Sequence, residues 1–144
     1  MSELTGYMLH FAFGADLSHA AFKRVCPAAE WFGPARMENH RLTFTVDGRA
    51  GVRAETGATV WGALWLVPAA MLPVLDGQAG ENYARTTRRI VSPAGPRTEA
   101  TLYLPVDGGT GGPPPALIKT LLAGAKENRL PATYVAELRA LEAG

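Results

Sequence analysis

Residues 60–80 read VWGALWLVPAAMLPVLDGQAG, and this stretch predicts the centre of the fold. Residues 59–67 are β-branched, aromatic and aliphatic, a composition typical of a central strand. Pro68 follows at a position where helices commonly begin, and apolar residues at positions 69, 71, 72 and 75 predict a short helix that ends near Gly77. A strand therefore leads directly into a helix in the middle of the chain.

Strand-like segments lie on both sides of this strand–helix unit. Residues 7–13 (YMLHFAF) form a short apolar run, and apolar residues at positions 42, 44 and 46 alternate with polar ones as in a half-buried sheet. Asp47 and Gly48 predict a turn. The predicted strands cover residues 7–13, 31–37, 41–46, 51–54, 59–67, 83–91 and 98–104.

Helical patterns gather towards the end of the chain. Ser18 is a candidate N-cap for a helix over residues 18–25, and two further helices are predicted over residues 116–128 and 132–142. Strands do not alternate regularly with helices, which argues against a doubly wound parallel sheet. We expect an α+β fold, a small mixed β-barrel with peripheral helices, formed by a single domain over residues 1–144.

The composition excludes several classes of protein. The chain has 144 residues, of which 47% are hydrophobic and 19% charged, so it can bury a core within one domain. Its 14 basic and 13 acidic residues give a net charge of +1, which argues against a nucleic-acid partner. The single cysteine, Cys26, excludes an intrachain disulfide and a multi-cysteine metal site.

No targeting or membrane segment is indicated. Residues 1–9 contain Glu3 and no basic cluster before their apolar stretch, unlike a secretory signal. The most apolar stretch is interrupted by Gly62, Pro68 and Pro73 and is shorter than the roughly 20 residues that span a bilayer. We expect a cytoplasmic protein that has no membrane partner.

No metal or cofactor site is indicated either. His10, His19 and His40 are not spaced as metal ligands on one helix, and the glycines of residues 108–112 lead into prolines rather than into a phosphate-binding helix. His10 differs from the other two because it lies in an apolar strand just before the first turn. We expect no metal and no cofactor.

Three separated segments resemble the γ-glutamylcyclotransferase-like (AIG2-like) family. Residues 10–17 (HFAFGADL) are similar to the family's Y-G-S-N-L strand and turn. Residues 60–80 resemble its V-W-G-x-x-W strand, helix and L-D-x-x-E-G segment, and residues 124–141 resemble its C-terminal helical pair with a G-A-x-E-x-x-L-P junction. The segments occur in the family's order, and together the resemblance covers nearly the whole chain.

The resemblance implies a cavity at one end of the barrel and a reaction that cyclises a γ-glutamyl compound to 5-oxoproline. The substrate's own α-amine attacks its γ-carbonyl, so the enzyme needs a base rather than a nucleophile. Backbone N–H groups of a turn can hold the substrate and the developing oxyanion. The turn implied to bind substrate here comprises Phe13, Gly14, Ala15, Asp16 and Leu17.

The sequence departs from the family at the catalytic carboxylate. The position of the family's Glu is Ala79, whose methyl group cannot transfer a proton. Either the reaction has been lost, or another carboxylate has taken over, or the Glu was removed by a deliberate substitution. Glu81 is the nearest candidate base, because residues two apart face the same side of an extended segment. Its alternative role is that of a solvated loop residue.

Other positions of the implied pocket also differ. Ala15 and Asp16 stand where Ser and Asn are usual, and Asp16 places a negative charge where relatives are expected to hold a substrate carboxylate. Either the ligand lacks that carboxylate, or Asp16 turns outward and caps the helix that begins near Ser18. Tyr83 matches a family aromatic residue, and Leu117 replaces a Tyr that closes the pocket in relatives.

Two functions from different classes therefore remain open. The first is a divergent cyclotransferase acting on a γ-glutamyl amine or amino acid, with Glu81, or less favourably Asp16, entering the cavity as its base. The second is a small-molecule binding or regulatory module that keeps the cavity without the reaction. The expected partner is a small-molecule γ-glutamyl compound, and the chain is expected to be a monomer or a homodimer.

Overall fold

The computed structural model describes residues 6–93, 95–107 and 109–143. The strands are β1 (Tyr7–Ala12), β2 (Glu30–Phe44), β3 (Ala50–Pro68), β4 (Tyr83–Ser92) and β5 (Gly95–Pro105). The α-helices are α1 (His19–Val25), α2 (Leu72–Ala79), α3 (Pro115–Glu127) and α4 (Ala132–Ala143), with short 3₁₀ turns η1 (Ala15–Leu17) and η2 (Ala69–Met71). None of the helices in these described ranges is long and apolar enough to cross a membrane.

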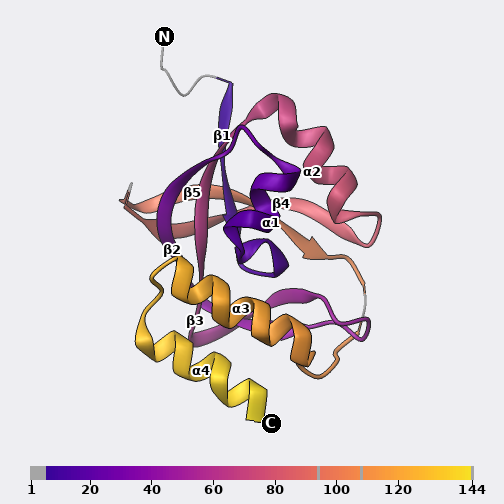
Figure 1. Ribbon diagram of the computed structural model, residues 1–144, viewed down its shortest axis with the longest axis vertical. Coiled ribbons are helices and arrows are strands. Elements are labelled where there is room, and N and C mark those ends of the chain that lie inside the picture. The colour runs from indigo at the N-terminus through magenta and orange to yellow at the C-terminus, as the bar shows by residue number, and fades with distance from the viewer. Residues whose placement is uncertain (1–5, 94, 108, 144) are drawn as a thin grey trace.

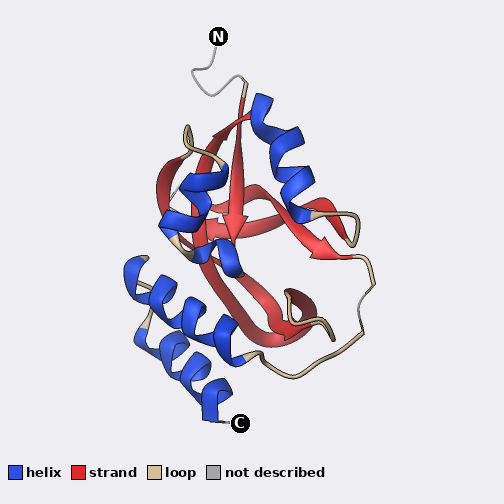
Figure 2. Cartoon of the chain, turned by 45° about the vertical axis from the view of Figure 1, so that its right-hand side comes forward, coloured by secondary structure: helices blue, strands red, loops and turns tan. Residues whose placement is uncertain are grey.

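The strands form a closed sheet in the order β1-β3-β2-β4-β5 (Figure 1). Most neighbours pair antiparallel, but β5 returns to β1 in parallel where Thr101 pairs with His10. The helices lie outside the sheet, with α3 and α4 side by side (Figure 2). The predicted α+β class, a small mixed barrel with peripheral helices, is therefore confirmed.

The hairpin of β2 and β3 replaces four shorter predicted strands. Residues 31–37 and 41–46 were predicted as separate strands, but Glu30–Phe44 is one strand with a register shift between Glu38 and His40. Asn39 absorbs the irregularity in the left-handed region, at a φ of 61°, and its side-chain oxygen accepts a hydrogen bond from the Gly57 amide of β3 (3.1 Å). A bulge thus bends the ribbon without ending it.

The strand-to-helix transition follows the prediction except at its end. Pro68 closes β3, η2 follows, and α2 runs to Ala79 rather than ending near Gly77. Gly80 terminates the helix at a φ of 87°, and its amide donates to the Asp76 carbonyl (3.1 Å). Gly80 therefore takes the C-terminal role that Gly77 was predicted to take.

Two apolar clusters position the turn after β1. Phe11 and Phe13 belong to one cluster and Ala12 to the other, as the two-residue period of a strand requires. Leu17 of η1 is fully buried and packs against Gly124 of α3, where an added Cβ would lie 2.8 Å from the Leu17 Cγ. The turn is thereby fixed between the sheet and the C-terminal helices.

Candidate functional site

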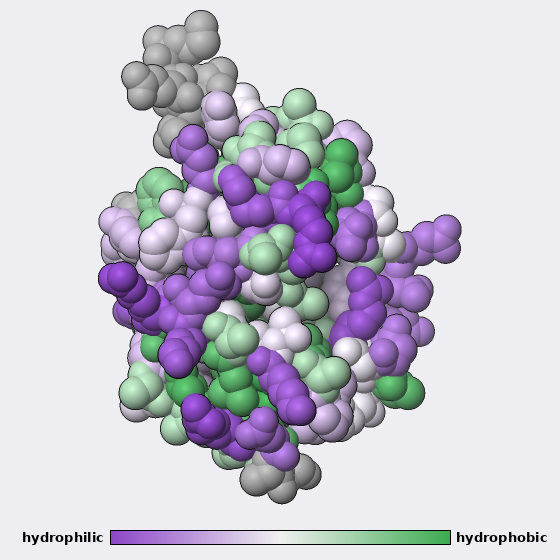
Figure 3. Space-filling model, in the orientation of Figure 1, coloured by the Kyte–Doolittle hydropathy of each residue, from purple (hydrophilic) through white to green (hydrophobic). Residues whose placement is uncertain are grey.

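A cavity of about 290 Å³ lies where this turn meets the helices and the β2–β3 hairpin, near the low end of the roughly 300–1,000 Å³ usual for small-molecule sites. A hollow is visible near the middle of the face shown in Figure 3. The lining residues are His10, Phe11, Phe13, Gly14, Ala15, Asp16, Ala21, Phe22, Val25, Gly48, Arg49, Ala50, Leu75, Gln78, Ala79, Tyr83, Tyr103 and Leu117. Most are apolar, and the charged groups come from different elements.

The turn implied by the sequence lines this cavity with four of its five residues. Phe13, Gly14, Ala15 and Asp16 all face it. Leu17 does not, because its side chain is buried in the core and its amide donates to the Gly14 carbonyl (2.9 Å). The structure therefore places Leu17 behind the cavity wall, as a packing residue of the turn.

Asp16 turns towards the cavity rather than towards α1. Its Oδ2 lies 3.1 Å from Nε2 of His10, and its Oδ1 accepts a hydrogen bond from the Gly14 amide (3.3 Å). The cap of α1 is Ser18, whose hydroxyl accepts from the Ala21 amide (3.3 Å). The alternative in which Asp16 caps that helix is therefore not the observed arrangement.

His10 was singled out in the sequence but was not expected to line the cavity. Its ring is only 2% exposed and stacks on Phe22 with centroids 5.0 Å apart and an interplanar angle of 6°. Its Nδ1 is buried and has no hydrogen-bond partner among the residues that the structure describes. The signal in the sequence was a histidine in an apolar strand, but the contact with Asp16 depends on the folded turn.

Arg49 enters the cavity from the end of the β2–β3 hairpin and was missed by the sequence analysis. Its guanidinium lies over the Tyr83 ring, 3.9 Å from the centroid, and donates to the Ala79 carbonyl (2.8 Å). The Tyr83 hydroxyl donates to the Ala50 carbonyl (3.0 Å). Burial raises the pKa of Tyr83, the Arg49 guanidinium opposes this rise, and the negative charges of Asp47 and Asp16 add to it.

Two other predicted positions also reach the cavity. Ala79 lines it at the C-terminal end of α2, and Leu117 lines it from the first turn of α3. Glu81 is exposed in the turn after α2 and is not part of the cavity lining. The two-residue spacing did not bring Glu81 to the position facing the cavity because Gly80 ends the helix and redirects the chain.

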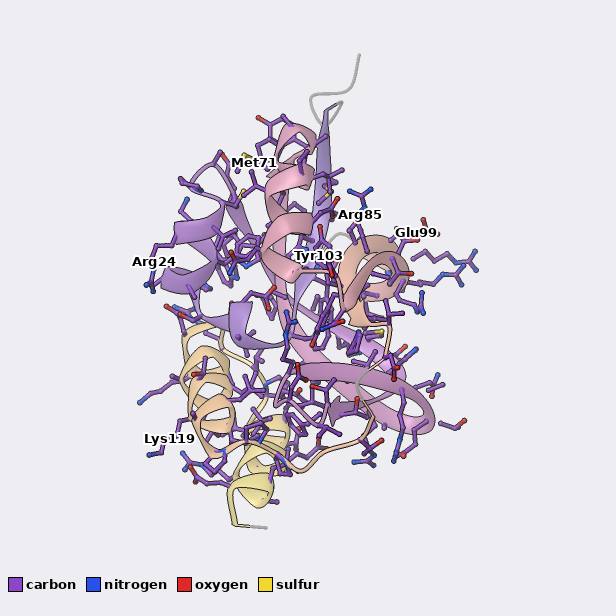
Figure 4. All side chains as sticks on the ribbon, turned by 90° about the vertical axis from the view of Figure 1, so that its right-hand side faces the viewer. Arg24, Met71, Arg85, Glu99, Tyr103 and Lys119 are labelled. Atoms are coloured by element: carbon purple, nitrogen blue, oxygen red, sulfur yellow. The ribbon has the colours of Figure 1, made fainter. Side chains whose placement is uncertain are left out.

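A second carboxylate near the cavity is occupied by structural contacts. Asp76 of α2 accepts a hydrogen bond from the Tyr103 hydroxyl (2.6 Å) and pairs with Arg85 (3.3 Å). Figure 4 shows Tyr103 and Arg85 beside α2. Burial and the bond to Asp76 raise the pKa of Tyr103, which therefore remains a donor. Asp76 does not line the cavity.

Within residues 6–93, 95–107 and 109–143, no three His, Cys, Asp or Glu side chains gather as a metal-binding group. The cavity instead combines an acidic side chain, a basic side chain and a backbone turn.

Comparison with known proteins gives concordant matches. The model of the AIG2-like family matches residues 59–138. The chain is 29% identical to a γ-glutamylcyclotransferase of Homo sapiens and 27% identical to one of Mus musculus, in both cases over 93% of the chain and 78% of the relative.

Solved structures agree with these matches. A γ-glutamyl cyclotransferase structure superposes with a TM-score of 0.87 at 28% identity, over 93% of this chain and 87% of that one. The Bacillus subtilis protein YkqA shares the fold, with a TM-score of 0.80 at 19% identity, over 96% of this chain and 55% of that one.

Proposed function

Because this chain belongs to the AIG2-like, γ-glutamylcyclotransferase-like family, we propose that its cavity binds a small γ-glutamyl compound and cyclises it to 5-oxoproline with release of an amine or amino acid. The reaction class comes from the relatives named γ-glutamylcyclotransferase. Fold alone does not specify chemistry, so the proposal depends on the groups that line this chain's own cavity.

The observation that carries the proposal is the pair of opposite charges in one cavity. A γ-glutamyl head group presents an α-amine and an α-carboxylate, and the cavity offers the Asp16 carboxylate and the Arg49 guanidinium. In the described part of the chain, no carboxylate lies within ion-pair distance of Arg49. Arg49 therefore keeps N–H donors for a substrate carboxylate, which guanidinium groups bind through paired hydrogen bonds.

The negative charge of Asp16 decides which end of the substrate lies beside it. A carboxylate beside Asp16 would be repelled, whereas an amine beside it donates N–H hydrogen bonds to the Asp16 carboxylate. The α-amine therefore lies on the Asp16 side and the α-carboxylate on the Arg49 side. The amine and the carboxylate share the α-carbon, and the γ-carbonyl extends from that carbon along the side chain. We expect the backbone N–H groups of Ala15 and Asp16 to support the negative charge that develops on its oxygen.

The reaction balances within the substrate. The α-amine nitrogen forms a bond to the γ-carbonyl carbon, the bond from that carbon to the leaving nitrogen breaks, and one proton passes from the attacking to the leaving nitrogen. No water is consumed and no redox partner is needed. The protein must orient the amine and move the proton, and Ala79 cannot do the second task.

The test is release of 5-oxoproline from a panel of γ-glutamyl amino acids and γ-glutamyl amines, with Ala79→Glu measured beside the wild-type chain. We expect the wild-type chain to release 5-oxoproline from at least one member, with γ-glutamyl compounds that keep the α-carboxylate preferred. If both chains are folded and neither releases 5-oxoproline from any compound, the proposed function is wrong.

A second candidate is a non-catalytic binding or regulatory module on the same fold. It is favoured by one observation, the methyl group of Ala79 in the cavity where the family pattern has its catalytic carboxylate. Isothermal titration calorimetry separates the two functions. A γ-glutamyl compound that binds and is recovered intact after prolonged incubation supports the module.

We further propose that the chain acts in the cytoplasm as a single domain, either as a monomer or as a homodimer. The buried thiol of Cys26, which is free, is compatible with a reducing compartment. Size-exclusion chromatography with light scattering measures the oligomeric state directly.

A further inference from the structure

We propose that Asp16, oriented by His10, is the proton-transfer base of this chain, in place of the glutamate that the family pattern has at position 79. This inference rests on the proposed function and names the group that carries it out. His10 acts as a positioning residue, since it contacts Asp16 rather than the reacting atoms.

Asp16 is placed for the task and the other nearby carboxylates are not. Among the described residues, Asp16 is the one carboxylate that lines the cavity, and its side chain is 39% exposed. Glu81 is exposed outside the lining, and Asp76 is held by Tyr103 and Arg85. A substrate bound in the cavity therefore meets the carboxylate of Asp16.

The surroundings of Asp16 fix its direction. The Gly14 amide donates to Oδ1, and the His10 ring approaches Oδ2 with Nε2 at 3.1 Å. A carboxylate oxygen accepts hydrogen bonds, so Nε2 of His10 is the donor in this contact. Stacking on Phe22 holds the ring in the plane that this bond requires.

The two sequence departures compensate each other. The family pattern has a carboxylate at position 79 and an amide at position 16, whereas this chain has a methyl group at Ala79 and a carboxylate at Asp16. Both positions line the same cavity. The cavity therefore keeps one carboxylate, supplied by the turn after β1 instead of by the end of α2.

In the proposed reaction Asp16 both accepts the proton and gives it back. As the α-amine nitrogen bonds to the γ-carbonyl carbon, its proton passes to the free lone pair of the carboxylate. As the bond to the leaving nitrogen breaks, Asp16 returns the proton to that nitrogen and is regenerated as a carboxylate. His10 donates from Nε2 throughout and keeps the carboxylate turned towards the substrate.

The first experiment compares kcat for 5-oxoproline release in single variants. Asp16→Asn restores the family's usual residue but cannot accept the proton, so we expect kcat to fall about 100-fold or more. Glu99→Gln, which removes a carboxylate outside the cavity on β5 (Figure 4), is the matched control and should keep the wild-type kcat. An Asp16→Asn chain with wild-type kcat, or a Glu81→Gln chain that loses turnover, overturns the inference.

The second experiment moves the carboxylate back. Adding Ala79→Glu to Asp16→Asn recreates the family pattern, and we expect kcat to recover by about tenfold or more over the Asp16→Asn chain. Circular dichroism and thermal melts verify that each variant is folded, and Asp16→Ser replaces Asp16→Asn if the latter does not fold. A folded double variant without recovery contradicts the exchange of roles.

His10 is tested by a split between kcat and KM. His10→Phe keeps the stacking on Phe22 but removes the donor, so we expect kcat to fall about tenfold with KM unchanged. His10→Gln carries an amide N–H that reaches Asp16 and should recover most of the loss. If His10 had only a structural role, its variants would have a lower melting temperature without a selective fall in kcat. Equal kcat values for His10→Phe and His10→Gln would contradict the positioning role of His10.

The same measurements separate this inference from the proposed function. An inactive wild-type chain beside an active Ala79→Glu chain overturns the role of Asp16 and the cyclising activity of the wild-type chain. Only the binding of γ-glutamyl compounds in the cavity then remains of the proposed function. If both chains are folded and neither releases 5-oxoproline, the proposed function and the inference are both wrong. Turnover in the wild-type chain that survives in Asp16→Asn overturns the inference alone.

Discussion

Arg49 is the cation of the cavity, and its binding role can be measured separately from proton transfer. Its guanidinium is held between the Ala79 carbonyl and the Tyr83 ring, which leaves N–H donors for a ligand. A hydrogen bond to a charged group contributes about 1.5–3 kcal/mol, so we expect Arg49→Met to raise KM about 10- to 150-fold with a small effect on kcat. Steady-state kinetics of 5-oxoproline release measure both constants.

The matched control for this prediction is Arg88→Met. Arg88 is exposed on β4 and donates to Thr86 and to the Thr87 carbonyl, away from the cavity lining. We expect its KM to equal that of the wild-type chain. A substrate whose α-carboxylate is converted to an amide should bind the Arg49→Met and wild-type chains equally. A large difference with that amide would assign Arg49 another role.

Among the individual residues of the cavity, the sequence predicted those that lie in family motifs and missed Arg49, which only the folded structure brings to the cavity. Asp16, Tyr83 and Ala79 were singled out by resemblance to a family pattern, and they line the cavity. Arg49 reaches Ala79 across 30 positions of the chain, and this contact forms only when folding brings the turn of the hairpin beside the end of α2. No local pattern around Arg49 encodes that contact.

The packing of η1 against α3 connects the cavity wall to the C-terminal helices. Gly124→Ala places a Cβ 2.8 Å from the Leu17 Cγ and 3.1 Å from its carbonyl carbon, so backbone or core must move. Overpacking of this kind typically costs about 1–3 kcal/mol, which exceeds the gain in helix propensity. We expect a lower free energy of unfolding in urea and, because η1 carries Asp16, a lower kcat.

Gly77→Ala is the matched control within another helix. Gly77 lies in α2, and an added Cβ there meets no heavy atom within 4 Å. The same substitution should therefore stabilise the chain by about 0.5–1 kcal/mol through helix propensity. If Gly124→Ala were also stabilising, the contact between Leu17 and α3 would not constrain the turn.

The bounds of the helices were predicted more accurately from the sequence than the bounds of the hairpin strands. The helices α3 and α4 follow their predicted ranges closely, because prolines near the start of each helix mark them locally. The hairpin strands were predicted in pieces, since polar residues such as Glu38, Asn39 and His40 interrupt the apolar alternation. The cross-strand bond from Gly57 to Asn39 holds the ribbon together there, and its partner is distant in sequence.

The buried tyrosines make the free energy of unfolding of the whole molecule depend on pH in the alkaline range. Burial raises the pKa of Tyr83, Tyr103 and Tyr134 in the folded chain. Unfolded tyrosines lose their protons near pH 10, so above that pH the unfolded chain holds fewer protons than the folded chain. The stability linked to these protons is fully present below about pH 10 and is lost as the pH rises towards the folded values.

Tyr103→Phe tests this dependence. The variant removes one of the three phenols, so the free energy of unfolding should fall less steeply between about pH 9.5 and 11, by up to about 1.4 kcal/mol per pH unit. Urea titrations across this range measure the slope of the free energy of unfolding against pH. The variant also loses the hydrogen bond to Asp76, but this loss is the same at every pH and does not change the slope. Tyr7→Phe, at an exposed site on β1, is the control, and an equal slope in both variants would contradict the prediction.

The architecture could be predicted as a class but not as a closed sheet. The order of strands followed by helices indicated an α+β fold, and the family resemblance implied the barrel. Closure depends on short contacts between distant residues, such as His10 with Thr101 and Arg36 with Val91. Such pairings leave no periodic trace in the sequence.

The opposite charges of the cavity have a kinetic consequence. Asp16 and Arg49 nearly cancel each other at a distance, and the chain as a whole carries a net charge of only +1. An anionic solute therefore encounters little long-range field and arrives by unassisted diffusion. The association rate constant should vary little with ionic strength, while selectivity for dipolar solutes arises only after the solute has entered, where both poles act at short range.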